Sequence, residues 1–232
     1  MSDTVIIPFR YRGPPHSGNG GWTSGHLAQL LDGGAVTVRL RTPPPLDEEL
    51  SVSYADDGTV ELYDGETLVA QAFAAEPLDR GSVPRPASFD EAAAAGAAYE
   101  GLVDHPFPTC FACGLREDGL ALRTGLLSGR EPVRAAAWVP SEVTPEVVWA
   151  ALDCPGAWAC GVAGRALVLG TITAELRELP SVAEQHVVMA WPTGQEGRKH
   201  FSGTALFDAE GRLLAQAEAI WLAVDAGSVR PV

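Results

Sequence analysis

The sequence lacks the features of a membrane protein. No window reaches the roughly 18 uninterrupted apolar residues that a transmembrane helix needs. No basic segment followed by an apolar run stands at the start of the chain either. We therefore expect no membrane partner and a cytoplasmic location.

Basic residues and cysteines are both scarce. The chain has 16 Lys and Arg against 30 Asp and Glu, a formal net charge of −14, and its only lysine is Lys199. Such a chain has no long-range positive field to attract phosphates, so we expect no nucleic-acid partner. Four cysteines in 232 residues are too few for a disulfide framework, which fits a reducing compartment.

The overall composition is that of a globular protein. Hydrophobic residues make up 46% of the chain and charged residues 20%. A chain of 232 residues forms one large domain or two small ones. At this size folding buries roughly 70% of the surface of the unfolded chain, so a substantial core is expected.

The most distinctive stretch runs from Gly18 to Gly34 and reads GNGGWTSGHLAQLLDGG. It predicts a glycine-rich loop that leads into a short helix, because Thr23 and Ser24 are favourable N-caps and the leucines that follow recur at helical spacing. A helix start reached through glycines presents free backbone N–H groups to an anionic group. The predicted helix ends on a carboxylate, Asp32.

A second stretch of the same kind runs from Thr144 to Gly156 and reads TPEVVWAALDCPG. Thr144 is the expected N-cap, Pro145 occupies the first helical position, and Asp153 falls near the end. The sequence thus predicts two short helices, each with one aspartate late in it.

Short strands surround both helices and indicate a duplicated unit. An offset of 136 residues aligns Thr37 with Thr173 and Pro44 with Pro180, and a later LVAQA segment matches LLAQA. Such a repeat predicts two units, each with one helix packed on an antiparallel sheet. The expected strands are residues 4–12, 35–41, 49–54, 59–63, 68–73, 133–138, 167–176, 186–191, 200–207 and 213–224.

The expected fold class is α+β, with an N-terminal unit at residues 1–86 and a C-terminal unit at residues 105–232. Residues 87–104 predict a linker with a short helix, because Ser88 and Glu91 form a capping box ahead of an alanine-rich run. The plain composition of this helix favours a spacer over a site.

Three segments resemble a known superfamily. The C-terminal unit opens with CFACGLREDGLALR, and the two units end in GETLVAQA and GRLLAQAEAIWL. These segments are similar to the opening and the last strand of hotdog-fold thioesterase-like proteins, here in a tandem, or double-hotdog, arrangement. The resemblance covers residues 15–76 and 105–225. It implies two hotdog units, each an antiparallel sheet wrapped around a central helix.

The resemblance also implies a site between the units. In this superfamily a helix begins at a small motif, commonly His-Gly-Gly, and carries an acidic residue nine positions later. Nine positions before Asp32 stands Thr23, and nine before Asp153 stands Thr144. The carboxylate of one unit faces the helix start of the other. Two sites of unequal quality are therefore implied.

The second helix start departs most from that motif. Pro145 has no N–H, and the carboxylate of Glu146 would repel an oxyanion, so we expect this start to be inactive. The expected competent site pairs Asp153 with the backbone N–H groups of Ser24 and Gly25 and with the loop from Asn19 to Trp22. The residues expected to bind substrate are Asn19, Gly21, Trp22 and His26.

Other interpretations of these residues remain open. Asp32 is the alternative active carboxylate. Either aspartate could instead accept hydrogen bonds from N–H groups at the end of its helix. Trp22 and His26 could instead pack at the start of the first helix. For a lone histidine the packing role is the more common one.

The resemblance implies hydrolysis of an acyl-coenzyme A thioester. A carboxylate in a partly apolar pocket activates water or attacks the carbonyl, while helix N–H groups stabilise the oxyanion. No cofactor is implied beyond the coenzyme A of the substrate. The alternatives are a non-catalytic protein that binds acyl groups or acyl-CoA, and a hotdog hydratase or dehydratase, whose Asp followed by a nearby His is not found here. A homodimer of the tandem unit is a further expectation.

The four cysteines also suggest a zinc site. Cys110 and Cys113 form a CxxC pair, and Cys154 and Cys160 complete the usual ligand inventory. The second pair is spaced by five residues in an apolar helical segment, which disfavours tetrahedral closure. We therefore expect no metal and four small, buried, hydrophobic side chains.

Overall fold

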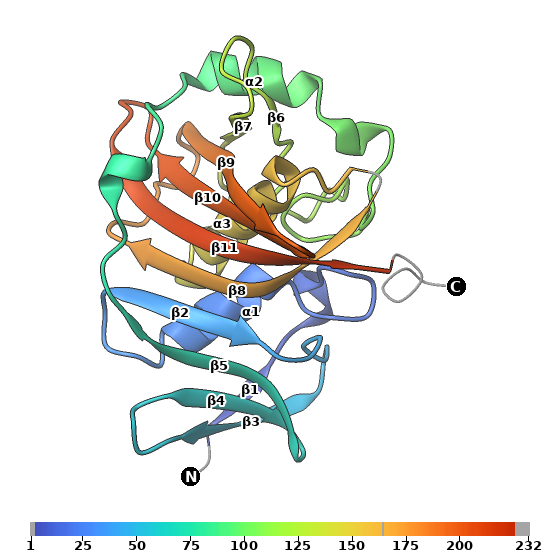
Figure 1. Cartoon of the computed structure of the whole chain (residues 1–232), viewed down its shortest axis with the longest axis vertical. Helices are drawn as coiled ribbons and strands as arrows, with labels where there is room; N and C mark the ends of the chain where they lie inside the picture. The colour runs from blue at the N-terminus through green and yellow to red at the C-terminus, as the bar shows by residue number, and fades with distance from the viewer. Residues whose placement is uncertain (1–2, 164, 226–232) are drawn as a thin grey trace.

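The structure is a computed structural model that describes residues 3–163 and 165–225. Its strands form one antiparallel sheet of eleven strands, which curves around two helices, α1 (Gly20–Ala28) and α3 (Pro145–Ala159) (Figure 1). The two helices pack against each other behind the sheet. This arrangement places the ends of both helices at the boundary between the two halves of the chain.

The N-terminal unit surrounds α1. Its strands lie in the order β1-β3-β4-β5-β2. The expected strand at residues 4–12 is shorter than predicted, because Pro8 has no N–H to donate and the chain turns into a 3-10 helix after it. The strands are β1 (Thr4–Ile6), β2 (Ala35–Leu40), β3 (Glu49–Tyr54), β4 (Val60–Asp64) and β5 (Thr67–Ala75).

The C-terminal unit repeats this design around α3. Its strands continue the sheet in the order β8-β11-β10-β9-β7-β6, which mirrors the order of the first unit from β2 outward. The expected tandem hotdog architecture of the α+β class is thereby confirmed. The strands are β6 (Gly125–Leu126), β7 (Arg134–Trp138), β8 (Ala166–Leu176), β9 (His186–Glu196), β10 (Lys199–Phe207) and β11 (Leu213–Val224).

The two units join at β2 and β8. These strands pair antiparallel, and Thr37 lies directly opposite Thr173, with their hydroxyl oxygens 2.7 Å apart. These are the same two threonines that the 136-residue offset aligns in the sequence. Equivalent residues therefore meet at the centre of the sheet, as expected where a pseudo-twofold axis relates two copies of a unit.

The linker contains α2 (Phe89–Ala97), which starts at the predicted capping box of Ser88 and Glu91. This helix packs on β7 and covers the face of the C-terminal sheet opposite to α3. Val187 and Met189 of β9 belong to its apolar cluster, whereas Val188 belongs to the main core, as alternation along a strand requires. The helix thus covers an apolar face as well as spacing the units.

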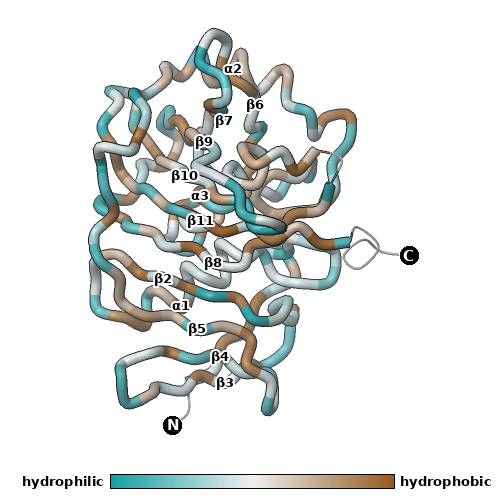
Figure 2. Tube along the Cα trace, in the orientation of Figure 1, coloured by the Kyte–Doolittle hydropathy of each residue, from teal (hydrophilic) through white to brown (hydrophobic). Residues whose placement is uncertain are grey.

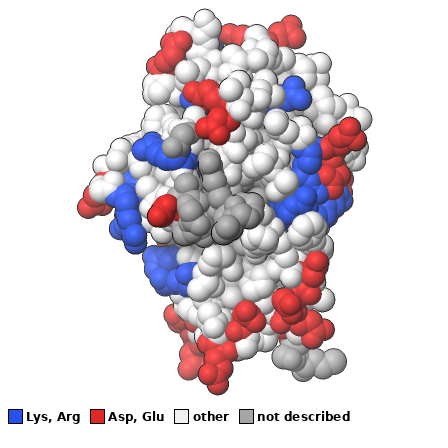
Figure 3. Space-filling model, turned by 90° about the vertical axis from the view of Figure 1, so that its right-hand side faces the viewer, with Lys and Arg blue, Asp and Glu red and all other residues white. Residues whose placement is uncertain are grey.

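The polar surface is unevenly charged. The turn between β3 and β4 is hydrophilic, as are many other turns (Figure 2). On the face shown in Figure 3, acidic side chains gather toward the end that holds the N-terminal strands, while Lys and Arg lie across the middle.

Among the described residues, no helix combines the length and apolar character that crossing a membrane requires.

Candidate active site

The start of α1 differs from the sequence prediction. The helix begins at Gly20, and its N-cap is Asn19, whose side-chain oxygen accepts from the Trp22 N–H at 2.8 Å. Thr23 and Ser24 lie inside the helix and are buried. Asparagine is among the strongest N-caps, so the glycines that look like a loop in the sequence form the first helical turn.

Glycines let α1 approach α3 closely. A Cβ added to Gly21 would lie 2.4 Å from the Cβ of Asp153 and 2.6 Å from the carbonyl oxygen of Trp149. A Cβ added to Gly25 would lie 2.7 Å from the Cβ of Trp149 and 2.8 Å from the Cα of Glu146. Gly25 therefore lies where α1 crosses α3, and only glycine leaves room there for the backbone of the neighbouring helix.

Asp153 is the centre of the site. Its side chain comes from α3 and is 3% exposed, and its Oδ2 accepts from the Gly21 N–H at 2.9 Å and from the Asn19 amide at 3.1 Å. Its Oδ1 has no hydrogen-bond partner among the described residues. The carboxylate of the C-terminal unit is thus held by the helix start of the N-terminal unit.

Burial raises the pKa of Asp153 to about 7, although the hydrogen bonds from Gly21 and Asn19 act in the opposite direction. Removing a carboxylate from water disfavours its charged form, and only two donors compensate here. A carboxyl group in this state exchanges a proton near neutral pH.

Asp153 lines a cavity of about 500 Å³ between the two units. The wall is mostly apolar, which suits a hydrocarbon chain, and it also includes the polar side chains of Asn19, Arg41, His105 and Asp153. The N-terminal unit contributes residues from its glycine-rich segment and the end of β2, and the C-terminal unit contributes residues from α3, β8 and β11. Among the lining residues are Asn19, Gly20, Leu40, Asp153, Trp158 and Leu169.

The other predicted site residues lie away from this cavity. The Trp22 ring stacks between Tyr11, at 4.4 Å between centroids, and His26, at 5.6 Å. Ser24 is fully buried. In the described part of the chain Trp22, Ser24, Gly25 and His26 are absent from the cavity lining, whereas Asn19 is present and Gly21 touches Asp153.

The expected match between Asp32 and Asp153 was wrong. Helix α1 ends at Ala28, and Asp32 lies beyond it on the exposed surface. Asp153 stands nine positions after its N-cap, Thr144, and nine positions after Asn19 the N-terminal unit has Ala28. The helix of the N-terminal unit therefore begins with glycines but has no acidic residue at the ninth position. The helix of the C-terminal unit has the acidic residue but does not begin with glycines.

The start of α3 faces His26 of α1. The Glu146 carboxylate lies 3.3 Å from the His26 Nδ1, and this hydrogen bond is the main cause that lowers the pKa of Glu146 to about 2. The carboxylate expected to spoil a second oxyanion site thus has a partner on the other helix. It ties the two helices together.

This contact makes a pH-dependent contribution to stability. Because folding lowers the pKa of Glu146 from its ordinary 4.5 to about 2, the contribution is complete above pH 4.5 and is lost as the pH falls toward 2. We expect Glu146→Gln to be less stable at neutral pH and to lose less stability across that acid range. Urea unfolding at a series of pH values measures this.

The exposed Glu66 serves as the control for this prediction. Glu66→Gln is expected to follow the wild-type curve. Parallel acid curves for wild type and Glu146→Gln would show that the contact with His26 adds nothing to stability.

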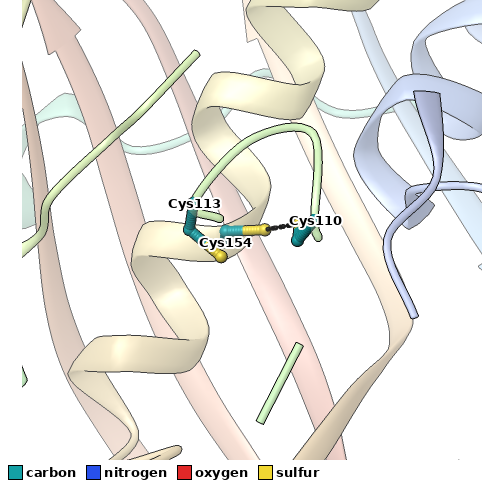
Figure 4. Close-up of side chains that lie close together, drawn as sticks. All are labelled: Cys110, Cys113 and Cys154. Carbon is teal, nitrogen blue, oxygen red and sulfur yellow. Dashed lines mark hydrogen bonds between the residues drawn. The ribbon is translucent and has the colours of Figure 1, made fainter. Parts of the chain in front are cut away.

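All four cysteines are buried, as expected, but three of them converge. The sulfur atoms of Cys110, Cys113 and Cys154 lie within 4.8 Å of one another, and all three residues line the cavity. Figure 4 shows Cys110 and Cys113 on one loop and Cys154 on α3. Cys160 lies apart, and its thiol donates to the carbonyl of Phe201 at 3.4 Å. The sequence showed the CxxC motif, but it gave no sign that the loop with this motif would lie against Cys154 of α3.

His105 also lines the cavity and was not predicted from the sequence. Its Nδ1 accepts from the Phe107 N–H at 2.9 Å, and its Nε2 lies 3.0 Å from the carbonyl oxygen of Cys113. Burial lowers the pKa of this imidazole. With both ring nitrogens engaged, His105 holds the loop that carries the cysteines.

No protein-family model matches the sequence, and neither does any curated protein. Among solved structures, the chain is similar to acyl-CoA thioesterase II TesB2 from Mycobacterium marinum, at 11% identity and a TM-score of 0.57, over 88% of this chain and 89% of that one. It is also similar to a hotdog-fold protein of unknown function from Alicyclobacillus acidocaldarius, at 13% identity and a TM-score of 0.59, over 100% and 93%.

A third similar structure is the dehydratase domain of a mycocerosic acid synthase-like PKS. The identity is 15% and the TM-score 0.59, over 97% of this chain and 92% of that one. At such identities the similarity establishes a shared tandem hotdog fold. It leaves the activity to be argued from the site, because one fold hosts many functions.

Proposed function

We propose that this protein hydrolyses acyl-coenzyme A thioesters at one site between its two units. One observation carries the proposal. A buried carboxylate, Asp153, is held through Oδ2 by the helix start of the other unit, while its Oδ1 is unpaired at the wall of an apolar cavity. This is the arrangement that a positioned general base requires.

In the proposed reaction Asp153 Oδ1 accepts a proton from water as the water oxygen attacks the thioester carbonyl. The new C–O bond gives a tetrahedral oxyanion, and its collapse breaks the C–S bond. The proton passes to the departing thiolate, which leaves readily without a strong acid. Gly20, at the positive end of the α1 dipole, lines the cavity where the oxyanion would form.

The cavity supports a substrate with an apolar and an anionic part. Its wall includes Leu169 and Trp158, which suit an acyl chain, and Arg41 lies at the same cavity. Basic side chains also lie across the middle of the face in Figure 3. They offer local positive charge to the phosphates of coenzyme A despite the net charge of −14.

A hydratase or dehydratase is less well supported. Such chemistry needs a histidine free to move a proton beside the aspartate. Two histidines line the cavity, but both ring nitrogens of His105 are engaged and His16 is exposed. A non-catalytic acyl-binding protein is the remaining alternative.

The proposal is tested by thiol release from short, medium, long and aromatic acyl-CoA compounds. We expect turnover of at least one class by the wild-type protein. Binding of an acyl-CoA, measured by calorimetry, without release of thiol would instead identify a binding protein. Neither turnover nor binding of any of these compounds would refute the assignment of an acyl-CoA site.

A further inference from the structure

Three thiols from two separate parts of the chain meet at the wall of the cavity. Cys110 and Cys113 belong to the loop before β6, and Cys154 belongs to α3 (Figure 4). Their exposures are only 2%, 4% and 9%. We infer that Cys110, Cys113 and Cys154 form a binding site for a thiophilic metal ion, with Zn²⁺ the expected ion.

The distances between the sulfur atoms fit such an ion. Cys110 Sγ and Cys154 Sγ are 3.5 Å apart, and all three sulfurs lie within 4.8 Å of one another. Zinc–thiolate bonds of about 2.3 Å in a tetrahedron place two sulfurs about 3.8 Å apart. The Cys110–Cys154 pair is therefore within a few tenths of an ångström of this spacing, and the other two pairs exceed it by at most about 1 Å.

The side-chain amide of Asn19 contacts two of the three sulfur atoms. It lies 3.8 Å from Cys110 Sγ and 3.7 Å from Cys154 Sγ, and it also donates to Asp153. Its two N–H groups thus serve two sulfurs and a carboxylate. Hydrogen bonds onto ligand atoms of this kind orient the ligands and stabilise their deprotonated form.

The fourth coordination position would be open to the cavity. The three thiols are the whole donor group found among the described residues, and each of them lines the cavity. Three protein ligands with one free position are typical of zinc sites that bind water or a small ligand, whereas purely structural sites are closed by a fourth side chain. The Oδ1 of Asp153 lies at the same wall and is a buried polar atom without a hydrogen-bond partner among the described residues.

The test uses the full chain, stripped of metal by a chelator and kept reduced by a phosphine. We expect one equivalent of Co²⁺ to produce the near-ultraviolet sulfur-to-cobalt charge-transfer band and the intense visible bands of a tetrahedral thiolate site. Zn²⁺ should then displace the cobalt and remove these bands. None of these measurements depends on thioester turnover, so they test the metal site independently of the proposed function.

Serine variants identify the ligands. Cys110→Ser, Cys113→Ser and Cys154→Ser are each expected to lower the Zn²⁺ affinity by at least about tenfold, because even the loss of an outer hydrogen bond costs about 10- to 100-fold. Cys160→Ser is the matched control, since Cys160 is buried but lies apart from the site, and it should bind Zn²⁺ like the wild type. Competition with a chromophoric chelator measures the affinities.

Three results would overturn the inference. The first is a wild-type protein with no charge-transfer band although all four thiols react after unfolding. The second is a disulfide between Cys110 and Cys154 that resists the phosphine. The third is a Cys160→Ser variant that binds as weakly as the other three. Where a serine variant fails to fold, the wild-type cobalt spectrum and the Cys160→Ser variant still test whether the metal site exists.

Discussion

Asp153→Asn is expected to lower kcat/KM for thiol release by about 100- to 10,000-fold, the range that a general base contributes. Asparagine keeps the size of the side chain and still accepts from the Gly21 N–H and the Asn19 amide. It cannot take a proton from water. The fold and the binding of the acyl-CoA should therefore persist while turnover is lost.

Asp32→Asn is the matched control for this prediction. Asp32 lies on the exposed surface beyond the end of α1, so its variant should turn over substrate like the wild type. Both variants are measured with the best substrate of the acyl-CoA panel, with circular dichroism to verify folding. A loss of activity in Asp32→Asn alone would mean that the proposed carboxylate is the wrong one.

Gly21→Ala is expected to reduce both activity and stability. The added methyl group would lie 2.4 Å from the Cβ of Asp153 and 2.6 Å from the Trp149 carbonyl oxygen, so α1 and α3 must move apart. Overpacking of this kind costs about 1–3 kcal/mol of folding free energy. The shift also breaks the hydrogen bond that holds Asp153 Oδ2, so turnover should fall further than the stability loss explains.

Gly194→Ala provides the comparison. Gly194 lies in β9, and a Cβ there would have its nearest contact at an ordinary 3.7 Å. Its unfolding midpoint in urea and its turnover should stay near the wild-type values. A Gly21→Ala variant as stable and as active as Gly194→Ala would contradict the close packing of the two helices.

Local signals in the sequence predicted much of the fold. Thr144 and Pro145 mark the start of α3, because a capping side chain and a proline without an N–H are both favourable at the first positions of a helix. The capping box of Ser88 and Glu91 marks the start of α2 in the same way. Turn residues between short β-branched runs located most strands. The repeat of Thr37 as Thr173 identified the two units, and the fold places these residues opposite each other.

The start of α1 could not be predicted in this way. Glycine disfavours a helix by local propensity, so Gly20 and Gly21 look like loop residues and Thr23 looks like the cap. In the folded chain Gly21 is required because α3 lies where any larger side chain would be. The error added Ser24 and Gly25 to the expected partners of Asp153, whereas the structure shows hydrogen bonds from Asn19 and Gly21 of the expected loop. It also made Asp32 look like a second copy of Asp153.

The sequence alone established that the chain has two similar units and that one helix begins at Pro145, because a repeat, a capping residue and a proline without an N–H can each be recognised without knowledge of the fold. Only the tertiary structure decided which groups meet at the site. Asn19, the loop with Cys110 and Cys113, and the part of α3 with Asp153 and Cys154 come from three separate segments of the chain. Their meeting depends on how closely α1 packs against α3 and on the loop that folds over both, and neither is encoded in local sequence.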